Sequence, residues 1–544
     1  MRARALPVVL AVGLVVAGCT GSDTADEPRG AAPEEATAAG VQSPAQPLTL
    51  LPEDDAAALT TGLSGALFES APVVVTARED DRPGMLLAAS AAVGLGVPLL
   101  VEDADLGDEV ERLGAGTVLA VGEAEGDAGG PEVVRVPASP DAVAEATGLE
   151  LGETDAVPED GAVGAVAALD RDEPVALVPE DEEPAAAGDV DRLPDVRPGD
   201  EQAGTLILVP GGEAALAAAA TARAAGAQVV VLEGTTDPRA SEPARAALAD
   251  EGTEHVVVLG AELAGADGLD WKLETAATGA ELPGGGQLLF PERMLVALYG
   301  HPGTGALGVL GEQPVDAAIQ RAREHAAPYE PLAGGRAVVP SFEIIATVAS
   351  EFPGPDGNYS AEADIELLRP WVEAAGAAGV YVVLDLQPGR TDFVTQAELY
   401  RPLLELPHVG LALDPEWRLA PNQVHLTQIG SVGVEEVNRV VAWLADLTRE
   451  LRLPQKLLVL HQFRLDMLPG RELLDVSREE LAVMVHADGQ GSQGDKQATW
   501  QALHQGAPPV WWGWKNFYDE DAPMLTPQQT MEQVVPAPDL VSYQ

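Results

Sequence analysis

Cysteine, lysine and aromatic residues are all scarce in this chain of 544 residues. There is one cysteine, Cys19, so the chain can form no internal disulfide and no cysteine metal site. Only four lysines occur, and the formal net charge is −56. Because nucleic-acid binding needs clustered lysine and arginine, this balance excludes a nucleic-acid partner. No apolar run after the N-terminal segment reaches about 18 residues, which predicts a mature chain without a transmembrane helix.

Several cofactor and nucleophile motifs are also missing from the sequence. The chain has no Gly-x-x-x-x-Gly-Lys-(Ser/Thr) loop and therefore no P-loop nucleotide site. It has no Gly-x-Ser-x-Gly nucleophile elbow. The pair Gly211-Gly212, which follows an apolar run, is too short for a dinucleotide fingerprint. We therefore expect no cofactor.

The N-terminal segment has the order of a secretory signal. Arg2 and Arg4 precede an apolar stretch from Ala5 to Val16, and the segment closes on Val16-Ala17-Gly18-Cys19. It resembles a bacterial lipoprotein signal, whose last cysteine is acylated and becomes the new N-terminus. The resemblance implies removal of residues 1–18, a lipid such as palmitate on Cys19, and anchoring to the extracellular face of the cell membrane.

Composition divides the rest of the chain into three parts. Residues 19–68 are predicted to be a disordered tether, because residues 20–50 are rich in small, acidic and proline residues and contain no aromatic residue. A second boundary lies near residue 270. Phe68 is the only aromatic residue before it, whereas all eight tryptophans and all seven tyrosines follow it. We therefore predict one folded domain over residues 69–270 and another over residues 288–544.

The first domain repeats short valine-rich runs separated by alanine-rich segments. This alternation predicts buried parallel strands joined by helices, as in βαβ units. A weaker copy starts at Glu173–Val178. The predicted strands are Ala71–Thr76, Val97–Val101, Thr117–Gly122, Thr205–Pro210, Gln228–Leu232 and His255–Gly260. The predicted helices are Gly84–Gly94, Leu106–Gly114, Glu213–Ala225 and Ala240–Glu251.

These repeats resemble the cell-wall-binding repeat 2 family of Gram-positive surface proteins. The likeness rests on the alanine-rich helices, the strand entries Gly-Val-Pro-Leu-Leu and Gly-Ala-Gln-Val-Val, and the ending Leu-Gly-Ala-Gly-Thr-Val-Leu-Ala-Val-Gly. It implies a cell-wall polysaccharide as partner. The chain lacks the family's usual repeat start, and its acidity opposes binding to an anionic wall polymer. A flavodoxin-like domain without a ligand is the alternative.

The second domain alternates eight predicted strands with helices, which is typical of a (β/α)8 barrel. Clear helices are predicted over Ala361–Ala378 and Val434–Leu451. The whole chain is therefore expected to be an α/β protein with a repeated βαβ domain followed by a barrel. The predicted barrel strands are Met294–Tyr299, Ala337–Ile345, Val380–Leu386, Val409–Leu413, Val424–Ile429, Lys456–Leu460, Leu481–Val485 and Pro509–Gly513.

Polar residues stand at or just past the carboxyl ends of these strands, where barrel enzymes build their active sites. Asp414-Pro415-Glu416, which follows the fourth strand, resembles the Asp-x-Glu ending of that strand in several barrel glycosidases and muramidases. The resemblance implies that Glu416 donates a proton, with Asp488 or Asp385 as nucleophile or base. The other candidate site residues are Tyr299, Glu343, Asp414, Trp417, His461, His486 and Trp514.

Three functions remain open for this rim. Paired carboxyl groups can hydrolyse a glycan, with Trp417 and Trp514 stacking on sugar faces. The barrel can instead bind a glycan without catalysis. A metal-dependent hydrolase or deacetylase would use histidines such as His301, but Gly300-His301-Pro302 stands where amidohydrolase barrels carry His-x-His, so no metal is predicted. The stretch Gly489–Lys496 is either a mobile loop over the rim or an ordinary surface loop.

Overall fold

The computed structural model describes residues 37–152 and 154–544. The predicted signal, Cys19 and residues 19–36 lie outside the described residues. The rest of the predicted tether is folded, because β3 (Leu48–Leu51) pairs with β14 (His255–Leu259) and α1 (Ala56–Leu67) buries its apolar face. The predicted boundary at residue 69 is therefore too late. Among the helices of the described ranges, none has the length and apolar character needed to cross a bilayer.

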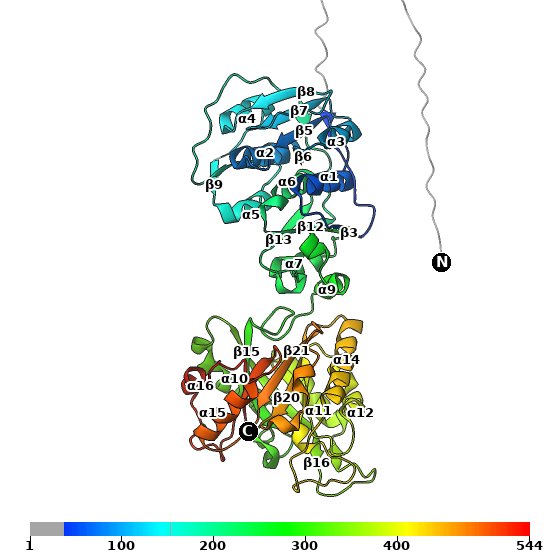
Figure 1. Ribbon diagram of the computed structural model, residues 1–544, viewed down its shortest axis with the longest axis vertical. Coiled ribbons are helices and arrows are strands. Elements are labelled where there is room, and N and C mark those ends of the chain that lie inside the picture. Colours follow the sequence, from blue (N-terminus) through cyan, green and yellow to red (C-terminus); the bar gives the residue numbers. More distant parts are fainter. Residues whose placement is uncertain (1–36, 153) are drawn as a thin grey trace, which may run out of the picture.

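Two four-stranded parallel sheets form the N-terminal part of the molecule (Figure 1). Their strand orders are β6-β5-β7-β8 and β13-β12-β14-β3, which confirms the repeated βαβ pattern. The weaker copy contributes β10 (Ala176–Pro179), which pairs with β9 (Thr154–Val157) as a separate sheet. The other strands are β5 (Val73–Ala77), β6 (Leu99–Val101), β7 (Thr117–Val121), β8 (Glu132–Val136), β12 (Thr205–Pro210) and β13 (Gln228–Leu232).

Alanine-rich helices join the repeats into one body with a common core. Helix α6 (Leu216–Ala224) packs against α1, α2 (Arg82–Leu95) and α5 (Ala162–Ala167). Small side chains let these helices approach closely, and α2 is buried from Gly84 to its last residue. Thr221 on α6 also links the repeats, since its hydroxyl donates to the Leu99 carbonyl at 2.8 Å and accepts from the Leu99 N–H at 3.1 Å.

The C-terminal part is a closed barrel of eight parallel strands, which confirms the predicted (β/α)8 class. Closure occurs where the first strand, β15, pairs with both β16 and the last strand, β23. Helix α11 (Ile365–Ala377) and helix α14 (Val434–Glu450) lie where the sequence predicted them. The strands are β15 (Arg293–Gly300), β16 (Ala337–Ala349), β18 (Tyr381–Leu386), β19 (Val409–Leu413), β20 (Lys456–Gln462), β21 (Leu481–Ala487), β22 (Trp511–Asn516) and β23 (Leu540–Tyr543).

One predicted strand is wrong and one strand was missed. Residues 424–429 form a loop after β19, where Val424 is 37% and Leu426 is 87% exposed and no strand pairs with them. Their alternating apolar and polar residues imitate a half-buried strand. The eighth strand is instead β23 at the end of the chain, between β22 and β15.

The amino end of the barrel is closed and faces the N-terminal part. Leu282, Leu289 and Phe290, which precede β15, pack into the apolar cluster at this end of the barrel. Glu479, just before β21, forms an ion pair with Lys272 of the N-terminal part. The N-terminal part lies above the barrel in Figure 1. The carboxyl ends of the barrel strands therefore point away from it.

Candidate active site

The barrel interior has an apolar layer near the amino end and a polar layer above it. Side chains alternate across a strand, and inward positions such as Val383 and Val459 belong to the apolar cluster. Two residues further along, the inward position is polar on every strand, and all eight side chains are buried. We call this set the polar layer. It consists of Tyr299, Glu343, Asp385, Asp414, His461, His486, Lys515 and Ser542.

An ion network crosses the polar layer. His461 Nε2 lies 2.6 Å from Glu343 Oε1, and His461 Nδ1 lies 2.9 Å from Asp488 Oδ2. On its other side, Asp488 Oδ1 lies 3.1 Å from Lys515 Nζ. The ammonium of Lys515 also sits 3.6 Å from the ring centre of Tyr299. Two carboxylates and two cations therefore alternate across the barrel.

The network determines the charge of its members. Burial alone would lower the pKa of His461, but Glu343 and Asp488 raise that pKa well above its usual value. Burial alone would raise the pKa of Asp488, but Lys515 and His461 lower it below the usual range. Lys515 likewise has a raised pKa because of Asp488, despite its burial.

Asp414 positions Glu416 at the edge of the polar layer. Asp414 follows β19 in an extended conformation and caps the short helix η7 (Pro415–Trp417), with its Oδ1 accepting the Glu416 N–H at 3.1 Å. Burial and the nearby Asp488 raise the pKa of Glu416 to about 7. Burial and Asp385 raise the pKa of Asp414 well above its usual value. Glu416 is only half-buried, so a carboxyl group with a raised pKa has access to solvent here.

Two members of the polar layer are held by hydroxyl groups. The Tyr299 hydroxyl donates to Asp385 Oδ2 at 2.9 Å, and burial raises the pKa of Asp385 to about 6. Ser542 Oγ lies 3.1 Å from His486 Nε2. Burial lowers the pKa of His486 to about 3, so its imidazole is neutral.

The polar layer brings together most of the residues predicted from the sequence. Glu343, Asp385, Asp414, His461, His486 and Tyr299 all belong to it, and Glu416 and Asp488 lie at its outer edge. Lys515 was expected at the rim from the sequence but without a role in the site, and Ser542 was not expected there. Lys515 carried a signal, since it is one of four lysines and follows a predicted strand. Ser542 was hidden because the last strand was not recognised.

The tryptophans on β22 do not line the site, which corrects the predicted role of Trp514. Trp514 is 1% exposed and points outward, where its ring lies 5.6 Å from Trp500 on α15 (Gln493–His504). A ring without an exposed face cannot stack on a sugar. Trp417 is partly exposed at the rim, with His425 at 5.3 Å.

Two further features expected at the rim are His301 and the glycine-rich stretch Gly489–Lys496, and both are held by local contacts. His301 Nδ1 lies 2.9 Å from the Ile345 carbonyl, and His301 is not part of the polar layer. The glycine-rich stretch Gly489–Lys496 runs into α15, whose first turn is capped by Ser492. Lys496 is buried and forms an ion pair with Asp521. The stretch is therefore tied down at its end.

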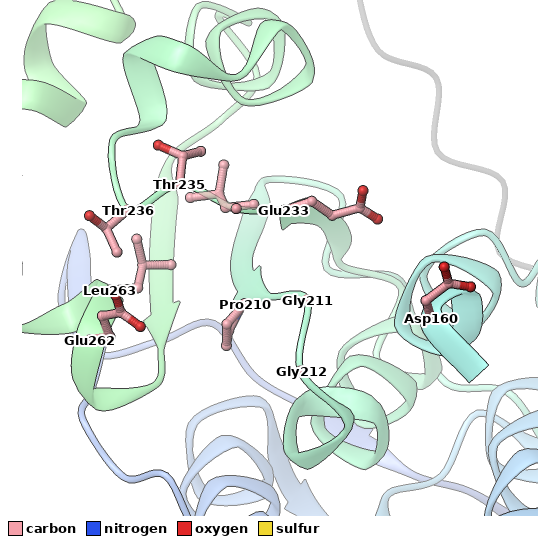
Figure 2. Close-up of a pocket in the computed structure, with 11 residues that line it drawn as sticks. Asp160, Pro210, Gly211, Gly212, Glu233, Thr235, Thr236, Glu262 and Leu263 are labelled. Atoms are coloured by element: carbon pink, nitrogen blue, oxygen red, sulfur yellow. The ribbon is translucent and has the colours of Figure 1, made fainter.

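A concave region lies in the N-terminal part. It is an open cleft of about 910 Å³ at the carboxyl ends of β12 and β13, where parallel sheets commonly bind ligands (Figure 2). Asp160, Glu233 and Glu262 line it together with the Gly211-Gly212 turn, and none of its lining residues is basic. This charge disfavours an anionic ligand such as an anionic wall polymer.

Comparisons with known proteins give two weak structural similarities. No family model matches the chain, and no curated protein matches its sequence. Cwp6 from Clostridium difficile is similar with a TM-score of 0.31 and 11% identity, over 62% of this chain and 62% of Cwp6. Cwp8 from the same organism is similar with a TM-score of 0.16 and 14% identity, over 67% of this chain and 49% of Cwp8. The chain spans less than two thirds of either protein, and neither similarity carries an argument about function.

Proposed function

We propose that the barrel hydrolyses glycosidic bonds, with Glu416 as proton donor and Asp488 as its ionised partner. One observation carries this proposal, namely the opposite shifts of the two pKa values. The pKa of Glu416 rises to about 7, whereas that of Asp488 falls below its usual range. Two carboxyl groups whose pKa values are pushed apart can act as acid and base at the same pH.

The proposed reaction needs only these two groups and water. Glu416 gives its proton to the bridging oxygen as the C–O bond breaks, so the leaving sugar departs as a neutral alcohol. Asp488 either removes a proton from the attacking water or attacks the anomeric carbon and is released by water in a second step. A carboxyl separation of about 5 Å corresponds to the second route, and about 6.5–9.5 Å to the first.

Other residues have supporting roles in this proposal. Lys515 and His461 keep Asp488 ionised, and Asp414 fixes the backbone of Glu416. The partly exposed ring of Trp417 offers a face on which a sugar can stack. Asp385, Glu343, His486 and Tyr299 supply polar atoms beneath the substrate.

Replacing Glu416 by Gln tests the proposal. We expect Glu416→Gln to lose about 10²–10⁴-fold in kcat on a cleavable aryl glycoside or an isolated wall glycan, with binding of that glycan retained. Glu435→Gln, the same change at an exposed position on α14, serves as the matched control. Equal activity of the two variants would refute the role of Glu416. Glycan binding by a wild-type chain that never cleaves would instead favour the non-catalytic alternative.

We also infer that the protein is held at the outer face of the cell membrane through Cys19. The order of charged, apolar and small residues over residues 1–19 supports this anchor. The resemblance of the N-terminal repeats to cell-wall-binding repeats adds an envelope polysaccharide as a proposed second partner. Cys19→Ala should move the protein from the membrane fraction to the soluble fraction, and a variant that stays in the membrane fraction would contradict the anchor.

A further inference from the structure

We propose that the polar layer binds one divalent transition-metal ion, zinc in the first instance, through Glu343, His461 and His486, with Asp385 as fourth ligand. One donor atom of each of the first three residues lies within 4.8 Å of the other two. Asp385 Oδ1 lies 3.9 Å from His461 Nε2. The proposal does not depend on glycosidase activity, because neither Glu416 nor Asp488 is a ligand.

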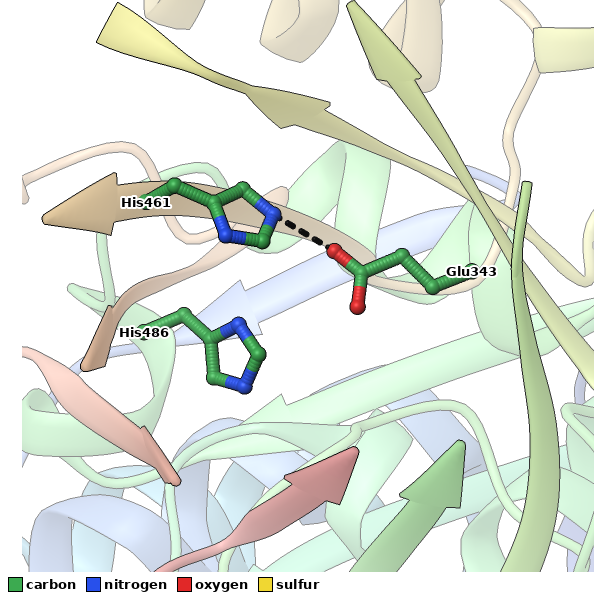
Figure 3. Close-up of side chains that lie close together, drawn as sticks. All are labelled: Glu343, His461 and His486. Carbon is green, nitrogen blue, oxygen red and sulfur yellow. Dashed lines mark hydrogen bonds and ion pairs between the residues drawn. The ribbon is translucent and has the colours of Figure 1, made fainter. Parts of the chain in front are cut away.

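Three of the donor atoms are buried and have no hydrogen-bond partner within the described chain. They are Glu343 Oε2, Asp385 Oδ1 and His486 Nδ1, on residues that are at most 1% exposed. A buried polar atom without a partner is destabilising, because it has lost its hydrogen bonds to water and gained none in the protein. Figure 3 shows one ring nitrogen of His486 facing His461 and Glu343, while the other points away. Glu343, His461 and His486 lie close enough together to share one cation, and a bound cation would give the unpaired atoms of Glu343 and His486 a partner.

Three of the four proposed ligands have a polar neighbour at their other polar atom. Metal-binding histidines usually direct one ring nitrogen at the ion and hold the other with a carboxylate or another polar group. Such outer contacts fix the orientation of each ligand and thereby favour binding. The contacts here are His461 Nδ1 to Asp488 Oδ2 at 2.9 Å, His486 Nε2 to Ser542 Oγ at 3.1 Å, and Asp385 Oδ2 to the Tyr299 hydroxyl at 2.9 Å.

The formal charges of the polar layer also call for a cation. Glu343, Asp385 and Asp488 carry three negative charges when ionised, whereas Lys515 and the protonated His461 carry two positive charges. Once a metal ion displaces the His461 proton, the deficit is two charges, and it becomes larger if Asp414 is ionised. Burying uncompensated charge is costly, so a divalent ion restores neutrality. The ion replaces the proton that His461 shares with Glu343 at 2.6 Å, and this proton leaves to solvent.

The donor set decides which class of ion fits. Two imidazole nitrogens and a carboxylate are typical ligands of zinc and other first-row transition metals. Calcium and magnesium prefer all-oxygen sites, which two histidines do not provide. The acidic surface of the chain will attract cations of any kind, so the test must separate this site from surface binding.

Calorimetric titration of the whole chelator-treated chain with zinc tests the site. We expect one tight equivalent per chain, with proton release visible as a difference between buffers of unlike ionisation enthalpy. His486→Gln should abolish this equivalent. Ser542→Ala removes only the outer contact and should weaken it by about 10–100-fold. His255→Gln, on strand β14 of the N-terminal part, is the matched control and should bind like the wild type.

Two results would overturn the proposal. One is the absence of a tight zinc equivalent, or an equivalent that persists unchanged in both His486→Gln and Ser542→Ala. The other is full displacement of zinc by an equal concentration of calcium, which would indicate surface carboxylates. Circular dichroism confirms the fold of each variant, and Ser542→Ala decides the question if His486→Gln fails to fold.

Discussion

At the scale of single residues, every lysine of this protein is buried and has a polar partner. All four are 3% exposed or less. Lys272 and Lys496 form ion pairs with Glu479 and Asp521, and Lys515 pairs with Asp488. The remaining one, Lys456, donates to two backbone carbonyls. Arginine therefore supplies the cationic side chains of the described surface.

This burial predicts unusual resistance to amine-specific reagents. In the native protein we expect an N-hydroxysuccinimide ester to label none of the four lysines, because the reagent cannot reach a buried amine. In denaturant all four should react, and peptide mass spectrometry would count the labelled sites. Rapid native labelling of Lys496 or Lys515 would contradict the closed structure around the polar layer.

The pKa of Glu416 predicts the pH dependence of the proposed reaction. A proton donor works only while protonated, and the pKa of Glu416 is raised to about 7. The value of kcat/KM should therefore fall about tenfold per pH unit above pH 7, because the protonated fraction of Glu416 falls at that rate. Glu435→Gln should keep the same profile. A rate that stays constant to about pH 9 would rule out Glu416 as the acid.

The residues of the candidate site could be predicted only in part. Polar residues at strand ends were found because a barrel strand turns from apolar to polar where its active-site end begins. Trp514 was misplaced, although the two-residue period of a strand puts it on the same side as Trp512 and opposite Lys515. The pairing of His461 with Glu343 and Asp488 joins three separate strands, so no local pattern reveals it.

At the scale of elements, the alanine-rich helix α6 is the joint between the repeats. Its residues are small enough to be covered by α1, α2 and α5 at once, and most of them are fully buried. A helix surrounded in this way has little room for directional contacts. Thr221 nevertheless makes two hydrogen bonds, because its hydroxyl pairs with both the N–H and the carbonyl of Leu99 on strand β6.

Replacing Thr221 by Val tests this joint. The change keeps the shape but leaves the buried Leu99 N–H and carbonyl without that partner. We expect the free energy of unfolding of the chain to fall by about 1–3 kcal/mol in urea denaturation. Thr499→Val, at a partly exposed position on α15, should change it by less than about 0.5 kcal/mol. Equal effects of the two variants would show that the contact is unimportant.

The strands were easier to predict than the boundaries of the fold. Strands of a closed barrel are buried on both faces, so seven of the eight stand out as continuous apolar runs. The missed strand β23 has only four residues, Leu540–Tyr543. It is recognised as a strand only from its pairing with β22 and β15. Leu48–Leu51 was likewise assigned to the tether, because its partner β14 lies about two hundred residues away in the sequence.

At the scale of the whole molecule, Trp271 contacts both the N-terminal part and the barrel. Its ring lies between Arg239 of the N-terminal part and Arg449 of barrel helix α14, with the guanidinium carbons 4.3 Å and 4.9 Å from the ring centre. Trp271 is 6% exposed. These two cation–π contacts connect the N-terminal part to the barrel.

Loss of this ring should loosen the molecule. We expect Trp271→Ala to cost about 3–5 kcal/mol in the contact between the parts and to increase the radius of gyration in small-angle X-ray scattering. Protease cleavage in residues 277–292 should also become faster. Phe352→Ala, which alters a 69% exposed aromatic residue, should change neither measurement. An unchanged radius and cleavage rate in Trp271→Ala would show that other contacts fix the arrangement.

Leu282, Leu289 and Phe290 close the barrel at its amino end, so its interior can be approached only from the carboxyl ends of the strands. Whatever enters it must turn back and leave by the same opening, so a polymer cannot be drawn through from end to end.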